Sequence, residues 1–325
     1  MPHAIRIHQH GDPEVLRWES VEVGEPGPGQ VRLRQQAVGL NFIDVYHRSG
    51  LYPIANFPSG IGLEGAGTVE AVGEGVSQVA PGDRVAYAYP PLGAYAEVRL
   101  MPADHLVRLP EAIDARTAAA MMLQGLTAQY LLRRTYRVQA GDWVLIHAAA
   151  GGVGLIACQW AKHLGARVIG TVGSDEKAEL ARAHGCEHPI VYSRESFPAR
   201  VREITGGEGV AVAYDSVGKD TFSGSLESLR PMGMLVSFGN SSGPVPPFEP
   251  ALLSAKGSLY LTRPTLMDYT RRREDLLAAA AELFQVVVEG AVRIEVRQTY
   301  PLAEAARAHR DLEARLTTGS SVLLP

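Results

Sequence analysis

The pattern of hydrophobic and polar residues changes character along the chain. Up to about Val107, short alternating or β-branched runs are separated by glycine and proline; examples are Val31 to Val38, Gly67 to Val72 and Arg84 to Tyr87. Such a pattern predicts strands joined by turns. From Asp114 to Arg134, alanine, methionine and leucine recur at three- and four-residue spacings, which predicts helix.

From Trp143 onward the pattern predicts strands and helices in alternation. The expected strands are Val144 to His147, Arg167 to Val172, Pro189 to Tyr192, Gly209 to Asp215, Met234 to Phe238 and Ser258 to Thr262. The expected helices are Gly152 to Leu164, Asp175 to Ala183, Phe197 to Ile204 and Asp220 to Leu229. This alternation is typical of a doubly wound parallel sheet. A long helix near Tyr269 to Glu289 and a strand at Ser321 to Leu324 are expected to complete the β-rich first part.

Composition narrows the class of protein. The chain has 325 residues, of which 46% are hydrophobic and 20% charged, which suits two domains with substantial cores. There is no apolar run of roughly twenty residues and no signal-peptide core, so we expect a cytoplasmic protein. The formal net charge of −4 argues against nucleic acid as a partner. The two cysteines are too few for a disulfide framework or a four-cysteine zinc site.

A run of small residues follows the first of these alternating strands. It reads Ala149-Ala150-Gly151-Gly152-Val153-Gly154 and leads into a helix. Small residues let the backbone approach a phosphate, and the free N–H groups of the first helical turn point at it. The strict G-x-G-x-x-G spacing is absent, so the strand–helix–strand context carries the prediction. We expect a phosphate-bearing cofactor at Ala150, Gly151, Gly152 and Val153.

The end of the second strand predicts which nicotinamide cofactor binds. An NAD site usually places a carboxylate there, but this strand ends on Gly173 and Ser174, with Lys177 shortly after and Tyr192 at the end of the third strand. A hydroxyl, an ammonium and a phenol suit a 2′-phosphate, so we predict NADPH. Asp175 is interpreted as an N-cap directed at its own helix.

Two later strand ends finish on small or polar residues where a dinucleotide would lie. The residues concerned, expected to offer groups to ribose and nicotinamide, are Ser216, Val217, Phe238, Gly239 and Asn240.

Several motifs together resemble the medium-chain dehydrogenase/reductase superfamily, most closely the NADPH-dependent quinone oxidoreductases of the zeta-crystallin-like branch. These motifs are Gly141 to Gly173, Asn41 to Asp44, Arg48 to Pro53, Tyr214 to Gly218, Val236 to Gly243 and Gly257 to Pro264. The resemblance implies an α/β fold in which residues 1–122 and 264–325 form a discontinuous GroES-like, β-rich catalytic domain. Residues 123–263 would form a Rossmann domain that binds NADPH. It also implies a homodimer whose Rossmann sheets join edge to edge.

The same resemblance implies chemistry without a metal. Asn41 stands where zinc-dependent alcohol dehydrogenases have a cysteine ligand, and Leu63, before Glu64, stands where they have a histidine. Neither residue can hold zinc. The acceptor must therefore need little activation, and a quinone meets that condition because its two-electron reduced anion is delocalised and takes its proton from water.

Candidate roles within the first domain are also implied by the resemblance. Asn41 is a candidate for a hydrogen bond to a quinone or ribose oxygen, and Tyr46 with Tyr52 for a wall of the substrate pocket. The alternative interpretation, that Asn41 only forms a turn and that the two tyrosines are ordinary half-buried residues, has about equal weight. Asp44 is a candidate ribose ligand, and Thr127 resembles a residue beside the nicotinamide. No side chain is assigned a catalytic role.

We therefore predict an NADPH:quinone oxidoreductase that transfers hydride without zinc. A zinc-free NADPH-dependent reductase of α,β-unsaturated aldehydes or ketones is the alternative enzyme, because it too delivers hydride to a conjugated acceptor. An alternative of another class is an NADPH-binding structural or RNA-binding crystallin-like protein, which the acidic charge balance disfavours.

Overall fold

The computed structural model describes residues 1–325, which separate into two compact units. Unit 1 comprises Met1–Leu126, Thr270–Phe284 and Ile294–Pro325, and unit 2 comprises Thr127–Tyr269 and Gln285–Arg293. Each unit is described by itself. The domain boundaries at 122/123 and 263/264 stay a prediction. No helix is long and apolar enough to cross a membrane.

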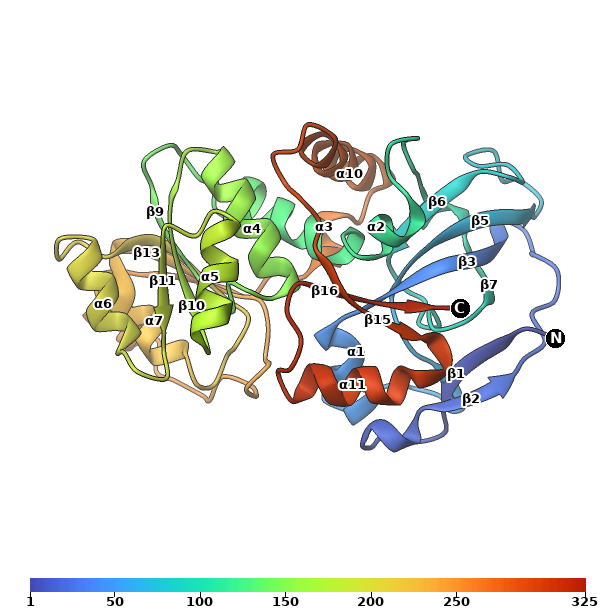
Figure 1. The fold of residues 1–325 in the computed structure, drawn as a ribbon, viewed down its shortest axis with the longest axis horizontal. Coiled ribbons are helices and arrows are strands. Elements are labelled where there is room, and N and C mark those ends of the chain that lie inside the picture. The colour runs from blue at the N-terminus through green and yellow to red at the C-terminus, as the bar shows by residue number, and fades with distance from the viewer. The chain divides into compact units, whose positions relative to one another are not determined.

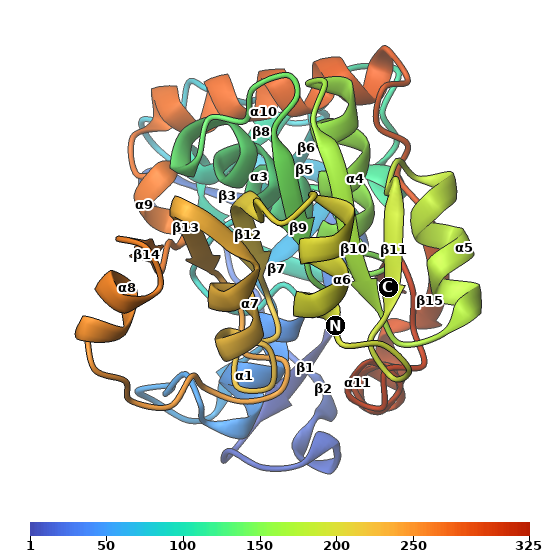
Figure 2. The same cartoon turned by 90° about the vertical axis from the view of Figure 1, so that its left-hand side faces the viewer.

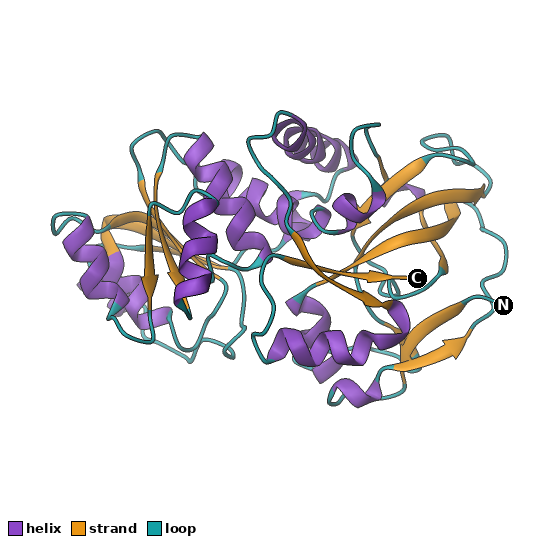
Figure 3. Ribbon diagram, viewed as in Figure 1, coloured by secondary structure: helices purple, strands orange, loops and turns teal.

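Unit 1 is built from two sheets (Figure 1, Figure 3). The smaller has the order β2-β1-β4, formed by Arg17–Ser20, His3–Ile7 and Ser59–Gly60. The larger has the order β15-β16-β3-β5-β6-β8, formed by Val296–Pro301, Ser320–Leu324, Gln30–Leu40, Glu64–Val72, Arg84–Ala88 and Val107–Arg108, and β7 (Val98–Pro102) also pairs with β3. The β-rich character predicted for this part is confirmed.

Long-range pairing brings the end of the chain back to unit 1. Strand β16 lies antiparallel to β3, with Val322 opposite Gly39. Residues from both parts, including Leu33, Val38 and Leu323, share one hydrophobic core. The α-helices that lie wholly within this unit are α1 (Phe42–Ser49), α2 (Ala115–Ala119) and α11 (Ala305–Glu313).

Unit 2 contains the predicted doubly wound parallel sheet, whose strand order is β11-β10-β9-β12-β13-β14 (Figure 2). The strands are β9 (Trp143–Ile146), β10 (Arg167–Val172), β11 (His188–Val191), β12 (Val210–Asp215), β13 (Leu229–Ser237) and β14 (Tyr260–Thr262). The strand order reverses between β9 and β12, and ligands of such sheets bind at the carboxyl ends of the strands beside that point.

Helices cover both faces of this sheet. Helices α4 (Gly152–His163) and α5 (Asp175–Ala183) contact each other, as do α6 (Phe197–Ile204) and α7 (Phe222–Ser228). Figure 1 shows the two pairs on opposite faces. Helices α8 (Ala251–Ala255) and α9 (Leu266–Tyr269) flank β14 in the sequence. The α/β fold class is thereby confirmed.

Three predicted elements differ most from the structure. The helical stretch at 114–134 divides into α2, α3 (Met122–Tyr130) and a π-helical turn at Leu131–Thr135. The predicted helix at 269–289 begins later, as α10 (Arg273–Val288). Strand β13 begins five residues earlier than predicted. Pro231 and Gly233 are typical of a turn and led to the later predicted start; Met232, between them, has a positive φ of 58°.

Candidate functional site

The predicted glycine-rich turn lies between β9 and α4 in unit 2. Gly151 is the N-cap of α4 and has no side chain to accept from the N–H groups of the first turn, which contains no acidic residue. A Cβ on Gly154 would lie 2.2 Å from the carbonyl oxygen of Ala148, so only glycine fits there. The turn therefore has the open, positively polarised helix end that suits the pyrophosphate of a dinucleotide.

A buried hydrogen-bonded chain lies beneath this turn. His147 Nδ1 lies 2.8 Å from Thr171 Oγ1, and His147 Nε2 lies 3.0 Å from Ser225 Oγ. Ser225 Oγ donates to Asp215 Oδ2 at 2.8 Å. Burial lowers the pKa of His147, which keeps the imidazole neutral. Ser225 is fully buried and is not a nucleophile; the chain ties β9, β10, β12 and α7 together.

Asp215 also shapes the loop that follows β12. Its Oδ1 accepts from the backbone N–H groups of Val217 and Gly218, at 2.8 and 3.0 Å. The loop after β13 packs directly against it: the N–H of Phe238 donates to the carbonyl of Asp215 at 2.8 Å. The predicted residues Ser216, Val217, Phe238, Gly239 and Asn240 thus lie in two loops that are in contact.

The predicted 2′-phosphate residues lie at the ends of β10 and β11. Ser174, not Asp175, is the N-cap of α5: its Oγ accepts from the N–H of Lys177 at 3.3 Å. The N-cap assigned to Asp175 was therefore wrong, because the hydroxyl one residue earlier takes that position and Asp175 becomes the first helical residue. A Cβ on Gly173 would lie 2.9 Å from the hydroxyl of Tyr192, so these two residues meet.

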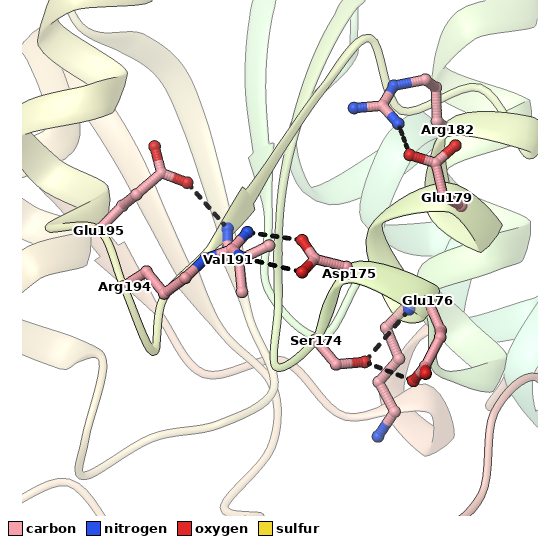
Figure 4. A network of polar contacts seen from close by, with 9 residues as sticks. Ser174, Asp175, Glu176, Glu179, Arg182, Val191, Arg194 and Glu195 are labelled. Carbon is pink, nitrogen blue, oxygen red and sulfur yellow. Dashed lines mark hydrogen bonds and ion pairs between the residues drawn. The ribbon is translucent and has the colours of Figure 1, made fainter.

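Asp175 has a different partner, which Figure 4 shows. Both oxygens of its carboxylate accept from Arg194, with Nη1 to Oδ2 at 2.8 Å and Nη2 to Oδ1 at 2.5 Å. Arg194 lies two residues after Tyr192, in the turn that follows β11. The pair therefore bridges the two segments that carry the predicted phosphate residues.

In unit 1, Asn41 precedes α1 and its carboxamide is held from both sides. Its Nδ2 donates to Glu64 Oε2 at 2.6 Å, and its Oδ1 accepts from Gln124 Nε2 at 3.1 Å. Glu64 Oε1 accepts from the N–H of Leu123 at 2.7 Å. Complete burial raises the pKa of Glu64 to about 8, so the carboxyl is mainly protonated at neutral pH.

Asp44 is fully buried in the same cluster. Its Oδ2 accepts from the N–H of Asn41 at 2.9 Å and from the hydroxyl of Tyr95 at 3.0 Å, whereas Oδ1 has no partner. Burial raises its pKa to about 7, although both hydrogen bonds lower it. The chain continues from Tyr95 to His309, which Arg48 contacts at 3.2 Å. Asp44 thus closes the first turn of α1, a structural task that adds to the predicted ribose contact.

The other predicted residues lie as follows. Tyr46 and Tyr52 contact each other edge to face, with ring centroids 5.2 Å apart, so unit 1 brings the predicted pocket wall together. Thr127 lies in α3, in unit 2, where it hydrogen-bonds to Tyr130. Leu63, at the position of the histidine ligand, is buried and apolar. No group of three or more His, Cys, Asp or Glu side chains is placed to hold a metal ion.

Sequence reasoning missed the partners of the predicted residues. Gln124 holds Asn41 from 83 positions away along the chain, and Tyr95 holds Asp44 from 51 positions away. His309, which contacts Tyr95, lies a further 214 positions along the chain. Arg194 was missed although it lies close to Tyr192 and carries the charge opposite to that of Asp175. Pairing Asp175 with a basic residue at the end of the neighbouring strand was the one available signal.

Comparisons with known proteins identify the family. Residues 27–111 match the alcohol dehydrogenase GroES-like domain, and residues 152–285 match the zinc-binding dehydrogenase family. The chain is 57% identical to a quinone oxidoreductase of Pseudomonas aeruginosa over 100% of both chains, and 50% identical to a 2-haloacrylate reductase of a Burkholderia species over 99% of this chain and 98% of the other.

A solved structure points the same way. The crystal structure of Escherichia coli quinone oxidoreductase complexed with NADPH matches with a TM-score of 0.98 at 50% identity, covering 99% of this chain and 100% of the other. The structural match covers both units of this chain, as do the two family matches taken together. The chain therefore belongs to the quinone oxidoreductase family of the medium-chain dehydrogenase/reductase superfamily.

Proposed function

We propose that this protein is an NADPH:quinone oxidoreductase that transfers hydride to its acceptor without zinc. The observation that carries the proposal is full-length similarity to quinone oxidoreductases, one of them solved with NADPH, together with a nucleotide-binding end of the unit 2 sheet that suits that cofactor. NADPH, when bound, supplies the hydride.

The residues of unit 2 have binding and orienting roles. The backbone of Ala150 to Val153 holds the pyrophosphate at the open N-terminus of α4, where the helix dipole favours anions. Ser174, Lys177 and Tyr192 hold the 2′-phosphate through charge-assisted hydrogen bonds. The loops at 216–217 and 238–240, fixed to each other through Asp215, hold the ribose and the nicotinamide ring. Thr127 lies beside that ring.

The residues of unit 1 act on the acceptor. Glu64 and Gln124 fix the Asn41 carboxamide and leave one of its N–H groups for an acceptor or ribose oxygen. Tyr46 and Tyr52 form a wall against which a flat ring can stack. Since Asn41 and Leu63 cannot serve as zinc ligands, the acceptor must accept hydride without a Lewis acid, which a quinone does.

Steady-state kinetics test the reaction. We expect NADPH oxidation with 1,4-benzoquinone to have a higher kcat/KM than with an α,β-unsaturated aldehyde. The relative named 2-haloacrylate reductase makes reduction of a conjugated alkene the second candidate function, and a clear preference for the alkene would establish it instead.

Cofactor choice has a separate test, in Lys177→Ala. Loss of the ammonium should weaken NADPH binding by about 1.5–3 kcal/mol and leave NADH binding nearly unchanged. Isothermal titration calorimetry measures both affinities. Equal losses for the two cofactors would contradict the phosphate site.

We also propose a cytoplasmic homodimer that does not bind nucleic acid. Strand β14 is an edge strand, and Tyr260 on it is 60% exposed, so a second β14 can extend the sheet. Light scattering should give twice the chain mass for wild type and the single mass for Tyr260→Asp. A gel-shift assay with RNA at physiological salt should show no complex, and cell fractionation should place the protein in the cytoplasm.

A further inference from the structure

A carboxylate lies next to the proposed 2′-phosphate site, which is an unfavourable place for one. Asp175 follows Ser174 directly and opens α5, and Glu176 lies close enough for Ser174 Oγ to contact its Oε2 at 3.4 Å. In this fold a carboxylate near the end of the second strand serves the unphosphorylated cofactor, because it accepts from the ribose hydroxyls and repels a phosphate. The chain must offset that charge to favour NADPH.

Arg194 provides the compensating charge. It binds both oxygens of Asp175 in a two-pronged ion pair, so that each oxygen already accepts from a guanidinium N–H group (Figure 4). Without Arg194, the charges on Asp175, Glu176 and Lys177 sum to −1. With it, they sum to zero. The neighbouring Glu195 contacts Arg200 at 3.1 Å and so has its own cation.

The pair is also placed to act on the site. Arg194 belongs to the turn that begins at Tyr192, and the Tyr192 hydroxyl lies against Gly173. The side chains of Asp175 and Arg194 are 71% and 59% exposed, so the pair contributes little to stability. Because the pair adds little to stability, its main effect is to neutralise the charge of Asp175 beside the proposed phosphate site.

We propose that Arg194 is a specificity-determining residue for the phosphorylated cofactor, acting by masking the carboxylate of Asp175. The inference rests on the proposed 2′-phosphate site at Ser174, Lys177 and Tyr192. Arg194 is a positioning and charge-compensating residue, not a catalytic one. Its removal exposes a carboxylate that disfavours NADPH but does not weaken the binding of NADH, which lacks the phosphate.

Calorimetric titration of the full-length protein with NADPH and NADH tests this. Arg194→Gln should weaken NADPH binding about three- to tenfold, the order of one charge–charge interaction in water, and should not weaken NADH binding. Asp175→Asn should bind NADPH at least as tightly as wild type. The double variant Asp175→Asn/Arg194→Gln should return to wild-type affinity, and the loss in Arg194→Gln should shrink as salt is raised.

The same titration with 2′,5′-ADP and 5′-AMP isolates the phosphate from the nicotinamide half. The matched control is Arg182→Gln, which removes an arginine of similar exposure from the Glu179–Arg182 pair on α5, the helix that Asp175 opens. It should leave both affinities unchanged.

Three results would overturn the inference. One is an unchanged NADPH affinity in Arg194→Gln, and another is an equal loss for NADH. The third is a double variant as weak as Arg194→Gln, which would mean that the guanidinium binds the phosphate itself. Lys177→Ala separates the two proposals. If Lys177→Ala weakens NADPH binding but not NADH binding, whereas Arg194→Gln weakens neither, only this inference fails. If neither variant weakens NADPH binding selectively, the proposed 2′-phosphate site itself fails.

Discussion

The buried carboxyl of Asp44 should make the protein less stable as the pH rises. Burial raises its pKa from 3.8 to about 7 in the folded state, and the unfolded chain returns to the ordinary value. The folded state therefore binds more protons than the unfolded state between these two values. Stability from this group is fully present below the unfolded pKa and is lost as pH rises through the folded one.

Asp44→Asn removes this titration with little change of shape. The new Oδ1 can take the place of Asp44 Oδ2 and keep the hydrogen bonds from the N–H of Asn41 and the hydroxyl of Tyr95. Its amide nitrogen then takes the place of the oxygen that has no partner. Any pH-independent difference in unfolding free energy between the two proteins cancels when their changes with pH are compared.

The magnitude follows from linkage. The full shift corresponds to about 4 kcal/mol at 1.36 kcal/mol per pKa unit, and somewhat more than half of it falls between pH 5 and pH 8. Wild type should therefore lose about 2–3 kcal/mol more unfolding free energy than Asp44→Asn over this interval. Glu64, whose pKa is also raised, is present in both proteins and largely cancels.

Urea unfolding followed by circular dichroism at several pH values measures this difference. Asp12→Asn is the control, because Asp12 is exposed in the same unit; its curve should run parallel to that of wild type. Parallel curves for Asp44→Asn and wild type would refute the reasoning, and so would a larger loss in the variant.

Further predictions concern two glycines of the proposed cofactor site and the ion pair of the buried Arg48. In Gly154→Ala the new Cβ would lie 2.2 Å from a backbone oxygen, so stability should fall by about 1–3 kcal/mol and NADPH binding should weaken. In Gly173→Ala the new Cβ meets only the hydroxyl end of Tyr192, so NADPH affinity should fall without loss of stability. Thermal melts and calorimetric titration check both variants. Arg48, 2% exposed, binds Glu313 with two hydrogen bonds of 2.8 Å. Arg48→Met should cost about 1–3 kcal/mol in urea unfolding through the loss of these bonds, whereas the exposed-pair control Arg310→Met should cost less than about 1 kcal/mol.

Elements whose ends are marked by nearby residues could be predicted from the sequence. The bounds of β10, α5 and α6 agree with prediction, because β-branched runs, small polar residues and helical spacing mark them. Strand β13 was predicted too short because Pro231 and Gly233 are ordinarily turn residues. Regular pairing with β12 and β14 starts at Met234, where the strand was predicted to begin, and Arg230 to Gly233 form an irregular segment between the Leu229–Val210 and Met234–Val212 pairs.

The glycine turn and the small residues at strand ends were predictable for the same reason: the chemistry lies in consecutive residues. The cluster around Asn41 was not, because its partners come from distant segments. Glu64 enters from β5, Gln124 from α3, and Tyr95 from the loop before β7. Only the folded sheet brings them together, and no pattern of one residue type marks them in advance.

That cluster explains how unit 1 can present an amide where zinc-dependent relatives present a metal. Asn41 cannot rotate freely, because its oxygen and one N–H are already bound by Gln124 and Glu64. Burial keeps Glu64 and, below about pH 7, Asp44 as neutral acids, so no cation is needed to balance them. A metal would require charged or basic donors, whereas this arrangement is neutral and rigid. If Asn41 contacts the acceptor as we propose, the cluster orients it without polarising it strongly, and only acceptors already reactive toward hydride are suited to such a site.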